Sequence, residues 1–459
     1  MTPIAGSPIL TASAMRDAEA AAMTGGVTVD TLMARAGEAV AEAVRRLAAG
    51  REVLILCGPG NNGGDGYVAA AALARAAVFV RVAATGEPRS DAAQRARARW
   101  HGPVEPLADA PAAPVVVDAL FGTGLARPLD PTLASALLRL AGDAQLTIAV
   151  DLPSGVATDT GEALGEVPRC DLTLALGAPK PAHLLQPAAR FCGTVRVLDI
   201  GVPAAGDVTV LDRPKLRPPG PDSHKFTRGM VAIASGGMAG AALLASEAAM
   251  RAGAGYVALL GPVRPGEPHA LVRKPLDDHA LADPRIGALL VGPGLGRGDD
   301  AKAILEKALA THHPLVIDGD ALHLVTPERL KARGGAMILT PHAGEFDALF
   351  GKGGASKIDR TLAAAGASGA VVAFKGADTV IAAPDGRAHV AGDANDWLST
   401  AGTGDVLAGT VSAMLASGLA PLDAAAAGVW LHRDAARRAG AAFIADDLAA
   451  MLTPARAGL

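Results

Sequence analysis

Aromatic residues, cysteines and an excess of either charge are all scarce in this chain. Aromatics are 3% of its 459 residues, the formal net charge is -4, and the cysteines are Cys57, Cys170 and Cys192. An odd count without CxxC spacing argues against a disulfide framework and against a zinc site. The weak net charge gives no electrostatic footprint for nucleic acid.

Long hydrophobic runs are also missing. No stretch of about 18 uncharged apolar residues could span a membrane, and the N-terminus lacks the pattern of a signal peptide. We therefore expect a cytoplasmic protein that binds neither membrane nor nucleic acid. Half of the residues are hydrophobic, and 55 glycines permit close packing of helices on sheets. At this length, two domains are the default.

Short apolar runs alternate with alanine-rich helical stretches, which predicts an α/β fold. Strands with apolar residues on both faces indicate a mainly parallel sheet covered on both sides. The predicted strands of the first half are 53–57, 78–83, 115–118, 147–151, 172–176 and 194–199. Helical stretches are predicted at 64–75, 90–100 and 131–141.

A second series of the same kind follows a proline-rich break at 203–221. Proline lacks a backbone donor and disfavours helix in the residue before it. We therefore predict domains at 1–211 and 222–459, joined by a linker at 212–221. The second series has predicted strands at 230–234, 256–260, 288–291, 315–318, 337–339, 370–374 and 379–382, and predicted helices at 404–415 and 422–439. The fold class is two α/β three-layer sandwiches.

The most informative motif of the first half is Gly58-Pro-Gly-Asn-Asn-Gly-Gly-Asp-Gly66. Its glycine spacing after a strand resembles a dinucleotide fingerprint. The acidic residue expected at the end of the next strand is missing, however, and the segment from Asn61 to Asp65 carries more polar groups than a pyrophosphate needs. A polar turn without function is the alternative reading.

Two further aspartates, Asp118 and Asp151, stand at predicted strand ends, each before a glycine-containing loop. The carboxyl ends of parallel strands line the ligand crevice, so these aspartates should converge with Asn62 and Asp65. Oxygen ligands without cysteine or histidine suit a hard cation. A single aspartate in this position is usually only a helix cap.

These motifs together resemble the YjeF N-terminal, or NAD(P)H-hydrate epimerase, domain over about residues 10–205. The matching segments are Leu32–Gly37, Gly58–Gly66, Asp118–Leu125, Asp151–Gly155 and the run Leu176-Gly-Ala-Pro-Lys180-Pro. The resemblance implies a Rossmann-like sheet that interconverts the R and S hydrates of NADH and NADPH. It implies substrate contacts at Asn61, Asn62, Gly63, Gly64, Asp65, Gly122, Thr123, Gly124, Leu125, Ala126, Arg127, Pro128 and Asp151, and a potassium ion held by Asn62, Asp118 and Ser154.

The chemistry of that reaction agrees with the residues. Inverting a hydrated carbon beside a ring nitrogen needs a group that moves a proton, and a partly desolvated carboxylate with a raised pKa can do so. We assign this role to Asp151, with Asp65 as its competitor.

The most informative motif of the second half is Ala401-Gly402-Thr403-Gly404-Asp405, at the start of a predicted helix. Glycines let backbone N–H groups face an anion, and the helix dipole favours negative charge. In a phosphotransferase, such an aspartate can take the proton of an attacking hydroxyl. The Gly351-Lys352 pair is followed by glycine, so a P-loop is excluded. A merely capped helix is the alternative reading.

Other motifs of this half also lie at predicted strand ends. They are Ser235–Ala241, Gly292-Pro-Gly-Leu-Gly296, Asp318–Leu322, Leu339-Thr-Pro-His342-Ala-Gly-Glu345 and Lys375-Gly-Ala-Asp-Thr379. A lone His342 would more often be structural, but its place between Pro341 and Gly344 favours a ligand-facing role.

This set, with His224–Gly229, resembles the ribokinase-like superfamily and more closely its NAD(P)H-hydrate dehydratase domain, over about 222–455. The resemblance implies ADP-dependent dehydration of the S hydrate, with Mg²⁺ accompanying ADP and with AMP and phosphate as products. Asp405 would deprotonate the C6 hydroxyl, which then accepts the β-phosphoryl group. The implied hydrate contacts are Ala241, Gly294, Gly296, His342 and Asp405. The implied nucleotide contacts are Lys375, Gly376, Ala377, Asp378, Thr379 and Gly404.

One segment departs from the family pattern, because Asn395–Thr400, with Trp397, replaces the usual glycine-rich approach to the catalytic loop. We expect this change to lower the rate without abolishing function. The bifunctional reading has two competitors: a vitamin-precursor kinase of the ribokinase-like type fused to a dinucleotide-binding module, and a non-catalytic dinucleotide sensor. The expected partners are NADHX, NADPHX and ADP, and we expect a homo-oligomer.

Overall fold

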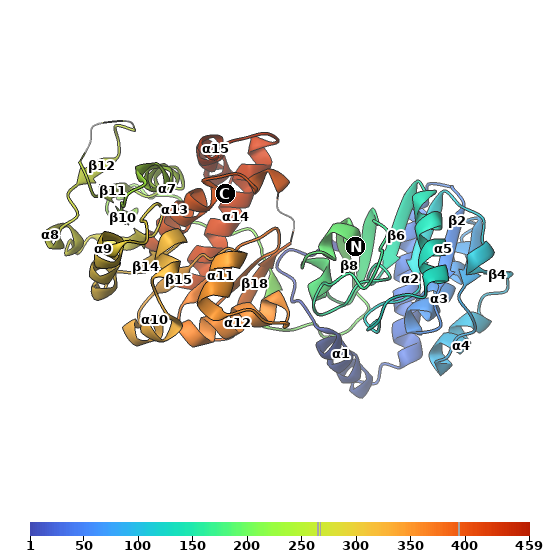
Figure 1. The fold of residues 1–459 in the computed structure, drawn as a ribbon. Coiled ribbons are helices and arrows are strands. Elements are labelled where there is room, and N and C mark those ends of the chain that lie inside the picture. Colours follow the sequence, from blue (N-terminus) through green and yellow to red (C-terminus); the bar gives the residue numbers. More distant parts are fainter. Residues whose placement is uncertain (264–265, 267, 393–394) are drawn as a thin grey trace. The chain divides into compact units, whose positions relative to one another are not determined.

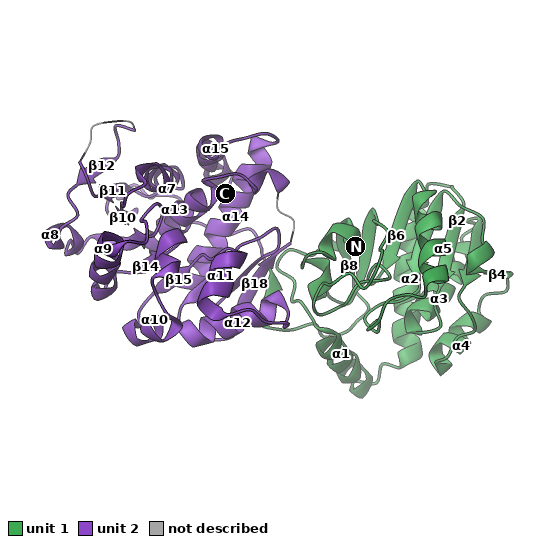
Figure 2. Ribbon diagram, in the orientation of Figure 1, with its two compact units in different colours: residues 1–210 green, residues 211–459 purple. Residues whose placement is uncertain are grey.

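A computed structural model describes residues 1–263, 266, 268–392 and 395–459. The chain divides into two compact units, Met1–Val210 and Leu211–Leu459 (Figure 2). Residues 211–220, which include most of the predicted linker, form neither helix nor strand. In the described ranges, no helix combines the length and the hydropathy needed to cross a bilayer.

The sheet of unit 1 has the strand order β1-β8-β7-β6-β5-β2-β3-β4 (Figure 1). Its strands are β1 (Thr2–Pro3), β2 (Val53–Cys57), β3 (Val80–Ala84), β4 (Val104–Pro106), β5 (Val115–Ala119), β6 (Leu146–Val150), β7 (Leu172–Leu176) and β8 (Thr194–Leu198). All neighbours are parallel except β1 and β8. The order reverses between β2 and β5, and the carboxyl ends beside such a switch point form a ligand crevice.

Helices cover both faces of this sheet, because successive side chains of each strand point to opposite faces and those on both faces are apolar. Val53 and Ile55 belong to the core shared with α2 and α3, while Leu54 and Leu56 pack with α5. The helices are α1 (Ala12–Thr24), α2 (Val29–Ala48), α3 (Asn61–Arg75), α4 (Asp91–Ala98), α5 (Pro131–Gly142) and α6 (Ala189–Cys192), with short 3-10 turns η1 (Leu107–Asp109) and η2 (Pro181–His183). A last strand, β9 (Val208–Val210), ends the unit.

Helix α3 is held closely against α2. A β-carbon added to Gly37 of α2 would lie 2.4 Å from Cβ of Val68 and 2.7 Å from the backbone oxygen of Asp65. Because protein interiors are close-packed, no larger residue fits without moving α3. The predicted epimerase loop therefore rests on a fixed helix.

The strands of unit 2 follow the order β12-β11-β10-β13-β14-β15-β16-β17-β18. They are β10 (Met230–Ala234), β11 (Tyr256–Leu260), β12 (Val272–Lys274), β13 (Ile286–Val291), β14 (Leu315–Ile317), β15 (Met337–Leu339), β16 (Val371–Phe374), β17 (Thr379–Ala382) and β18 (Ala388–Ala391). The sheet is parallel from β12 to β16, and β17 runs antiparallel to both of its neighbours, β16 and β18.

The main core of unit 2 lies between this sheet and four helices, α7 (Ala239–Arg251), α13 (Thr403–Ala416), α14 (Pro421–Ala439) and α15 (Ala445–Ala457). The remaining helices are α8 (Asp278–Leu281), α9 (Asp299–Ala310), α10 (Pro327–Arg333), α11 (Ala343–Phe350) and α12 (Lys357–Ser368), with 3-10 turns η3 (Gly319–His323) and η4 (Asp396–Leu398). The predicted class, two α/β domains with mainly parallel sheets, is confirmed.

Several predicted boundaries were wrong by a few residues. Helix α3 begins at Asn61 rather than at Gly64, because the polar residues of the motif form its first turn. The strands predicted to end at Asp118, Asp151, Asp199 and Asp318 end instead at Ala119, Val150, Leu198 and Ile317. Three of these four aspartates therefore lie just beyond their strands, where a side chain can cap the next turn.

Candidate active sites

The first candidate site lies at the switch point of unit 1, where the loop after β2 meets the end of β5. A β-carbon on Gly58 would lie 1.8 Å from the backbone oxygen of Leu120, and one on Gly63 would lie 1.9 Å from the oxygen of Gly58. Only glycine allows these approaches. They bring the first turn of α3, with Asn61 and Asn62, to the carboxyl ends of the strands.

Asp118 and Ser154 form a buried polar pair beside this turn, and both are 0% exposed. The Asp118 carboxylate accepts hydrogen bonds from Leu120 N–H (3.1 Å), Ser154 Oγ (2.7 Å) and Ser154 N–H (2.8 Å). Burial raises the pKa of Asp118, and the bonds from Ser154 and Leu120 oppose this rise. A carboxylate has about four acceptor positions, so one remains open.

Asn62 lies close to Asp151 across Gly122. A β-carbon on Gly122 would lie 3.0 Å from Asp151 Oδ2 and 3.2 Å from Asn62 Oδ1. The Asn62 Nδ2 atom is buried without a hydrogen-bond partner in the described part of the chain. A buried amide N–H without an acceptor is costly, so this atom is free to serve a ligand.

Asp151 is held by residues that follow β7. Its Oδ1 atom accepts from Leu176 N–H (3.2 Å) and from the ammonium of Lys180, which also donates to the Leu176 oxygen (2.7 Å). Its backbone oxygen accepts from Nε2 of His183 (2.6 Å), whose Nδ1 accepts from Lys180 N–H (2.8 Å). These partners fix the neutral tautomer of His183, and burial lowers its pKa to about 4.

The other carboxyl groups near Asp151 have raised pKa values. Burial raises the pKa of Asp65 well above its ordinary value, and the charges of Asp151 and Glu19 add to the rise. Burial and Asp151 likewise raise the pKa of Glu19, which comes from α1. Burial and like charge thus both favour the protonated form of the Asp65 carboxyl group.

The predicted loop from Gly122 to Pro128 follows β5 without regular structure. Gly122, Thr123 and Leu125 are partly buried, whereas Gly124, Ala126, Arg127 and Pro128 are exposed. Gly63 and Gly64 lie buried in α3, so their contribution to a site is through the backbone. The predicted substrate contacts thus comprise buried glycines of α3 and partly or fully exposed residues of the loop after β5.

The second candidate site is centred on Asp405 in the first turn of α13. Gly402 precedes this helix with φ +88°, a conformation that favours glycine, and a β-carbon there would lie 2.8 Å from Leu244 Cδ1. Burial raises the pKa of Asp405 to about 6; Asp318, Glu345 and Asp320 add to the rise and Lys375 opposes it. Such a carboxylate can exchange a proton near neutral pH.

Lys375, at the end of β16, is the cation that faces this carboxylate. Its ammonium lies 2.7 Å from Asp318 Oδ1, which also accepts from Thr340 Oγ1 (2.7 Å). Burial lowers the pKa of Lys375, but the attraction of Asp318 and Glu345 outweighs it and the net shift is upward. A β-carbon on Gly404 would lie 3.4 Å from Lys375 Nζ, so the ammonium stands at the N-terminus of α13.

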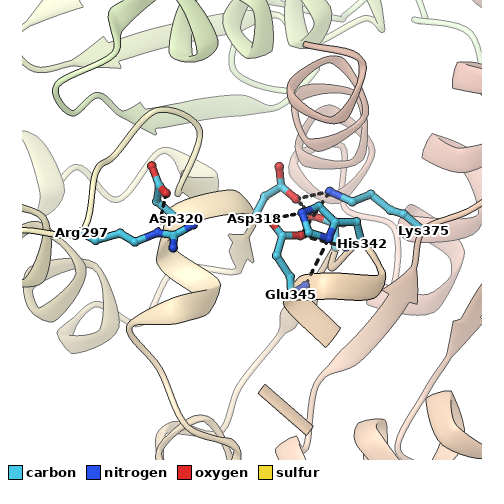
Figure 3. Close-up of polar contacts among 7 residues, drawn as sticks. Arg297, Asp318, Asp320, His342, Glu345 and Lys375 are labelled. Atoms are coloured by element: carbon cyan, nitrogen blue, oxygen red, sulfur yellow. Dashed lines mark hydrogen bonds and ion pairs between the residues drawn. The ribbon is translucent and has the colours of Figure 1, made fainter. Parts of the chain in front are cut away.

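His342 and Glu345 begin α11 as a reciprocal pair (Figure 3). Glu345 Oε2 accepts from His342 N–H (2.8 Å), and His342 Nδ1 accepts from Glu345 N–H (3.2 Å). Both groups thereby satisfy backbone donors at the start of the helix. The His342 side chain is 61% exposed, so its ring remains open to a ligand.

Gly294 lies against Ala241, and Gly296 contacts Asp320. A β-carbon on Gly294 would lie 3.1 Å from that of Ala241, and Gly294 itself has φ +63°. Gly296 N–H donates to Asp320 Oδ2 (2.9 Å), and Asp320 Oδ1 accepts from Arg297 Nε (2.9 Å), the pair drawn beside Asp318 in Figure 3.

A cavity of about 510 Å³ opens beside Lys375. Its lining includes the predicted residues His342, Lys375, Gly376, Ala377, Thr379 and Gly404, together with Asn395, Asp396, Leu398, Ser399, Thr403, Leu407, Val429, His432 and Arg433. Asp378 does not line this cavity, and its carboxylate lies 2.7 Å from Lys357 Nζ. Trp397 is 50% exposed, and its neighbours rather than its own ring line the cavity.

Several site residues were not found from the sequence. His432 and Arg433 come from α14, whose sequence predicts a helix but no site, and the motifs around Lys180 and His183 predict no role for either residue. One signal was available, because Lys180 is the only lysine among residues 1–210. Within the described ranges, no three His, Cys, Asp or Glu side chains form a group that could hold a metal ion.

Two family models match this chain, one in each of its two units. The family model described as YjeF-related protein N-terminus matches residues 29–182, and the model described as NAD(P)H-hydrate dehydratase matches residues 231–454. An ADP/ATP-dependent NAD(P)H-hydrate dehydratase structure from Bacillus subtilis, co-crystallised with ATP and Mg²⁺, is 29% identical, with a TM-score of 0.45 over 52% of this chain and 93% of that one.

Two relatives carry the name bifunctional NAD(P)H-hydrate repair enzyme Nnr. The one from Escherichia coli is 33% identical over 91% of this chain and 87% of its own length. The one from Thermofilum pendens is 36% identical over 89% of this chain and 87% of its own length. The resemblance drawn from the motifs is confirmed: the chain belongs to the family of bifunctional NAD(P)H-hydrate repair enzymes, in which an epimerase unit precedes a dehydratase unit.

Proposed function

We propose that unit 2 dehydrates the S hydrate of NADH or NADPH at the expense of ADP, with Asp405 as the catalytic base. The observation that carries this proposal is the Asp405 carboxylate, whose pKa is raised to about 6 and which stands at a helix N-terminus beside Lys375. A base with such a pKa can accept a proton at neutral pH and return it.

The proposed reaction has two steps, phosphoryl transfer and elimination of phosphate. Asp405 takes the proton of the C6 hydroxyl, and the hydroxyl oxygen bonds to the β-phosphorus of ADP while the bond to AMP breaks. Loss of phosphate from C6, with a proton from C5, then forms the double bond of the reduced nicotinamide. Backbone N–H groups at Gly404 and the Lys375 ammonium stabilise the charge on the transferred phosphoryl group.

We propose that different residues of this site bind the hydrate and the nucleotide. Ala241, Gly294, Gly296 and His342 contact the hydrate, and the segment Lys375–Thr379 with Gly404 contacts the nucleotide. Within that segment, we propose that Asp378 acts through Lys357 rather than by direct contact, since their side chains are paired.

Mg²⁺ fits the donor chemistry of this edge. Proteins bind Mg²⁺ through one or two carboxylates together with substrate phosphates. Asp318 and Asp320 supply carboxylate oxygens at this site, and one or both of them, together with the nucleotide phosphates, would hold the ion. When bound, Mg²⁺ would neutralise charge on the nucleotide phosphates.

We propose that unit 1 interconverts the R and S hydrates, with Asp151 moving the proton and Asn61–Asp65 and Gly122–Pro128 holding the substrate. Potassium fits the oxygen atoms of Asp118, Ser154 and the Asn62 amide, while the unpartnered Nδ2 of Asn62 remains a donor for the substrate. The residues Asn62, Asp118 and Ser154 would hold K⁺, and its charge would favour an anionic substrate phosphate nearby.

One assay tests both proposals. The full chain is mixed with NADPH hydrates and ADP, and recovery of reduced-nicotinamide absorbance is followed. We expect complete recovery from the R and S mixture and no recovery with Asp405→Asn, which should still exchange R and S. No recovery of absorbance with either ADP or ATP would refute the dehydratase.

Three finer proposals accompany this function. Replacing K⁺ by Na⁺ should slow R/S exchange and leave dehydration unchanged. Light scattering should detect a homo-oligomer. A cytoplasmic location is supported by the three cysteines, which are free and buried.

A further inference from the structure

Lys180 is a buried cation in an otherwise lysine-free half of the chain. It is 0% exposed, and it is the only lysine among residues 1–210. Burying an ammonium can cost more than its ion pair returns, and apolar residues of the same volume are often equally or more stabilising. The position therefore points to a role other than stability.

The ammonium acts on one oxygen of Asp151. Oδ1 accepts hydrogen bonds from both Lys180 and Leu176 N–H, whereas Oδ2 faces Gly122, 3.0 Å from the point where a β-carbon would stand. Lys180 is itself anchored through the Leu176 oxygen at 2.7 Å. One carboxylate oxygen is thus held by the protein, and the other is directed at the proposed substrate loop.

His183 holds the backbone of the same residue. Asp151 has φ +65°, which is uncommon outside glycine and persists only when the surrounding structure imposes it. The ring of His183 joins the Asp151 oxygen to Lys180 N–H, so the backbone of Asp151 and that of Lys180 are fixed by one imidazole.

Two other carboxyl groups lie near Asp151, and the cation Arg16 interacts with one of them, Glu19. Asp65 of α3 and Glu19 of α1 both interact electrostatically with Asp151. Lys180 is the cation paired with Asp151, and without it the buried carboxyl groups of Asp151 and Asp65 would lose the ammonium beside them. Like charges at such a distance repel, and the carboxylates would turn away or take up protons.

We propose that Lys180 is a positioning residue for epimerisation: it holds Asp151 through Oδ1 so that Oδ2 faces the hydrate, while His183 fixes the Asp151 backbone. This inference rests on the proposed role of Asp151 in unit 1. Lysine suits the place better than arginine because its compact ammonium can reach Oδ1 and the Leu176 oxygen together.

The test is a double-mutant cycle in the full-length chain with Lys180→Met, Asp151→Asn and both together. R/S exchange is measured by chromatography of NADPH hydrates, and dehydration of the S hydrate in unit 2 is the internal control. We expect Lys180→Met to lower kcat for exchange by about 100-fold with KM little changed, as for loss of a positioned proton-transfer group. The double variant should be no slower than Asp151→Asn, because Lys180 acts through Asp151.

Unit 1 could unfold in the methionine variant, so Lys180→Gln is made in parallel. Glutamine is neutral but keeps an N–H donor for the Leu176 oxygen, and we expect a folded unit with kcat lowered at least about tenfold. Lys180→Arg, which keeps the charge, should not restore the wild-type rate.

The outcomes separate the two proposals. Wild-type kcat in a folded Lys180→Gln variant, or losses that multiply in the double variant, would overturn the role of Lys180. Wild-type exchange by Asp151→Asn would overturn the role of Asp151 itself, and absence of exchange in the unmodified chain would refute the epimerase function.

Discussion

Replacing Asp405 by asparagine should stabilise unit 2 while it abolishes dehydration. Burial and the nearby carboxylates raise the pKa of Asp405 from 3.8 to about 6. At neutral pH the ionised group thus costs about 3 kcal/mol relative to the unfolded chain, at 1.36 kcal/mol per pKa unit. The helix dipole favours the negative charge by up to about 1 kcal/mol, and partial exposure reduces the penalty. We expect a net gain of about 2 kcal/mol.

The pH dependence gives this prediction its sign. Below about pH 4 the aspartate is protonated in both states, and the stability that its raised pKa provides is fully present. As the pH rises towards 6, the unfolded chain loses the proton first and the wild type is destabilised. The stability gained by Asp405→Asn should therefore grow between pH 4 and pH 6 and level off above pH 7.

Urea unfolding followed by tryptophan fluorescence measures the effect. Trp397 and Trp430 belong to unit 2 and Trp100 to unit 1, so a Trp100→Phe background reports unit 2 alone. Because the comparison is between variants in one background, any cost of the Phe substitution cancels. A stability difference that stays constant from pH 4 to pH 8, or a less stable asparagine variant at pH 8, would refute the reasoning.

Three further predictions follow from the same structure. The dehydration kcat should fall about tenfold per pH unit below pH 6, where the catalytic carboxylate becomes protonated; a flat profile to pH 5 in a rate assay would contradict this. Gly122→Ala should slow R/S exchange, because its β-carbon would lie 3.0 Å from Asp151 Oδ2, whereas Gly142→Ala, which meets nothing within 4 Å, should exchange normally. Gly37→Ala should lower the unfolding free energy of unit 1 by about 2 kcal/mol or more, since its β-carbon would lie 2.4 Å from that of Val68; an unchanged thermal midpoint would argue against the close packing.

The strands were the easiest part of the fold to predict. Val53–Cys57 and Met230–Ala234 are short apolar runs that end at glycines or polar residues, and the structure has them unchanged. Helix α2 was not predicted, although Leu32, Ala36, Val40 and Val44 form an apolar stripe along it. Helix α3 was predicted too short because asparagine and glycine favour loops. In the first turn of α3, packing against α2 outweighs the preference of these residues for loops.

The sites divide in the same way between local and distant information. Motifs at strand ends predicted that Asp151 would lie near Asn62, because topology alone brings such ends together. The partners of these residues could not be predicted, since the pairing of Asp318 with Lys375 spans 57 residues and depends on tertiary packing. The contact of Lys180 with Asp151 could not be predicted either, because it also depends on tertiary packing.

The turn between β16 and β17 carries a consequence for which changes the proposed nucleotide segment can accept. Lys375–Asp378 close an antiparallel hairpin in which Phe374 pairs with Val380, so the proposed nucleotide segment is a tight turn of fixed length. Inserting one residue would reverse the facing of every side chain on one strand. Side-chain exchanges within the turn leave this register intact, whereas an inserted residue has to be absorbed by the turn or by the strands beside it.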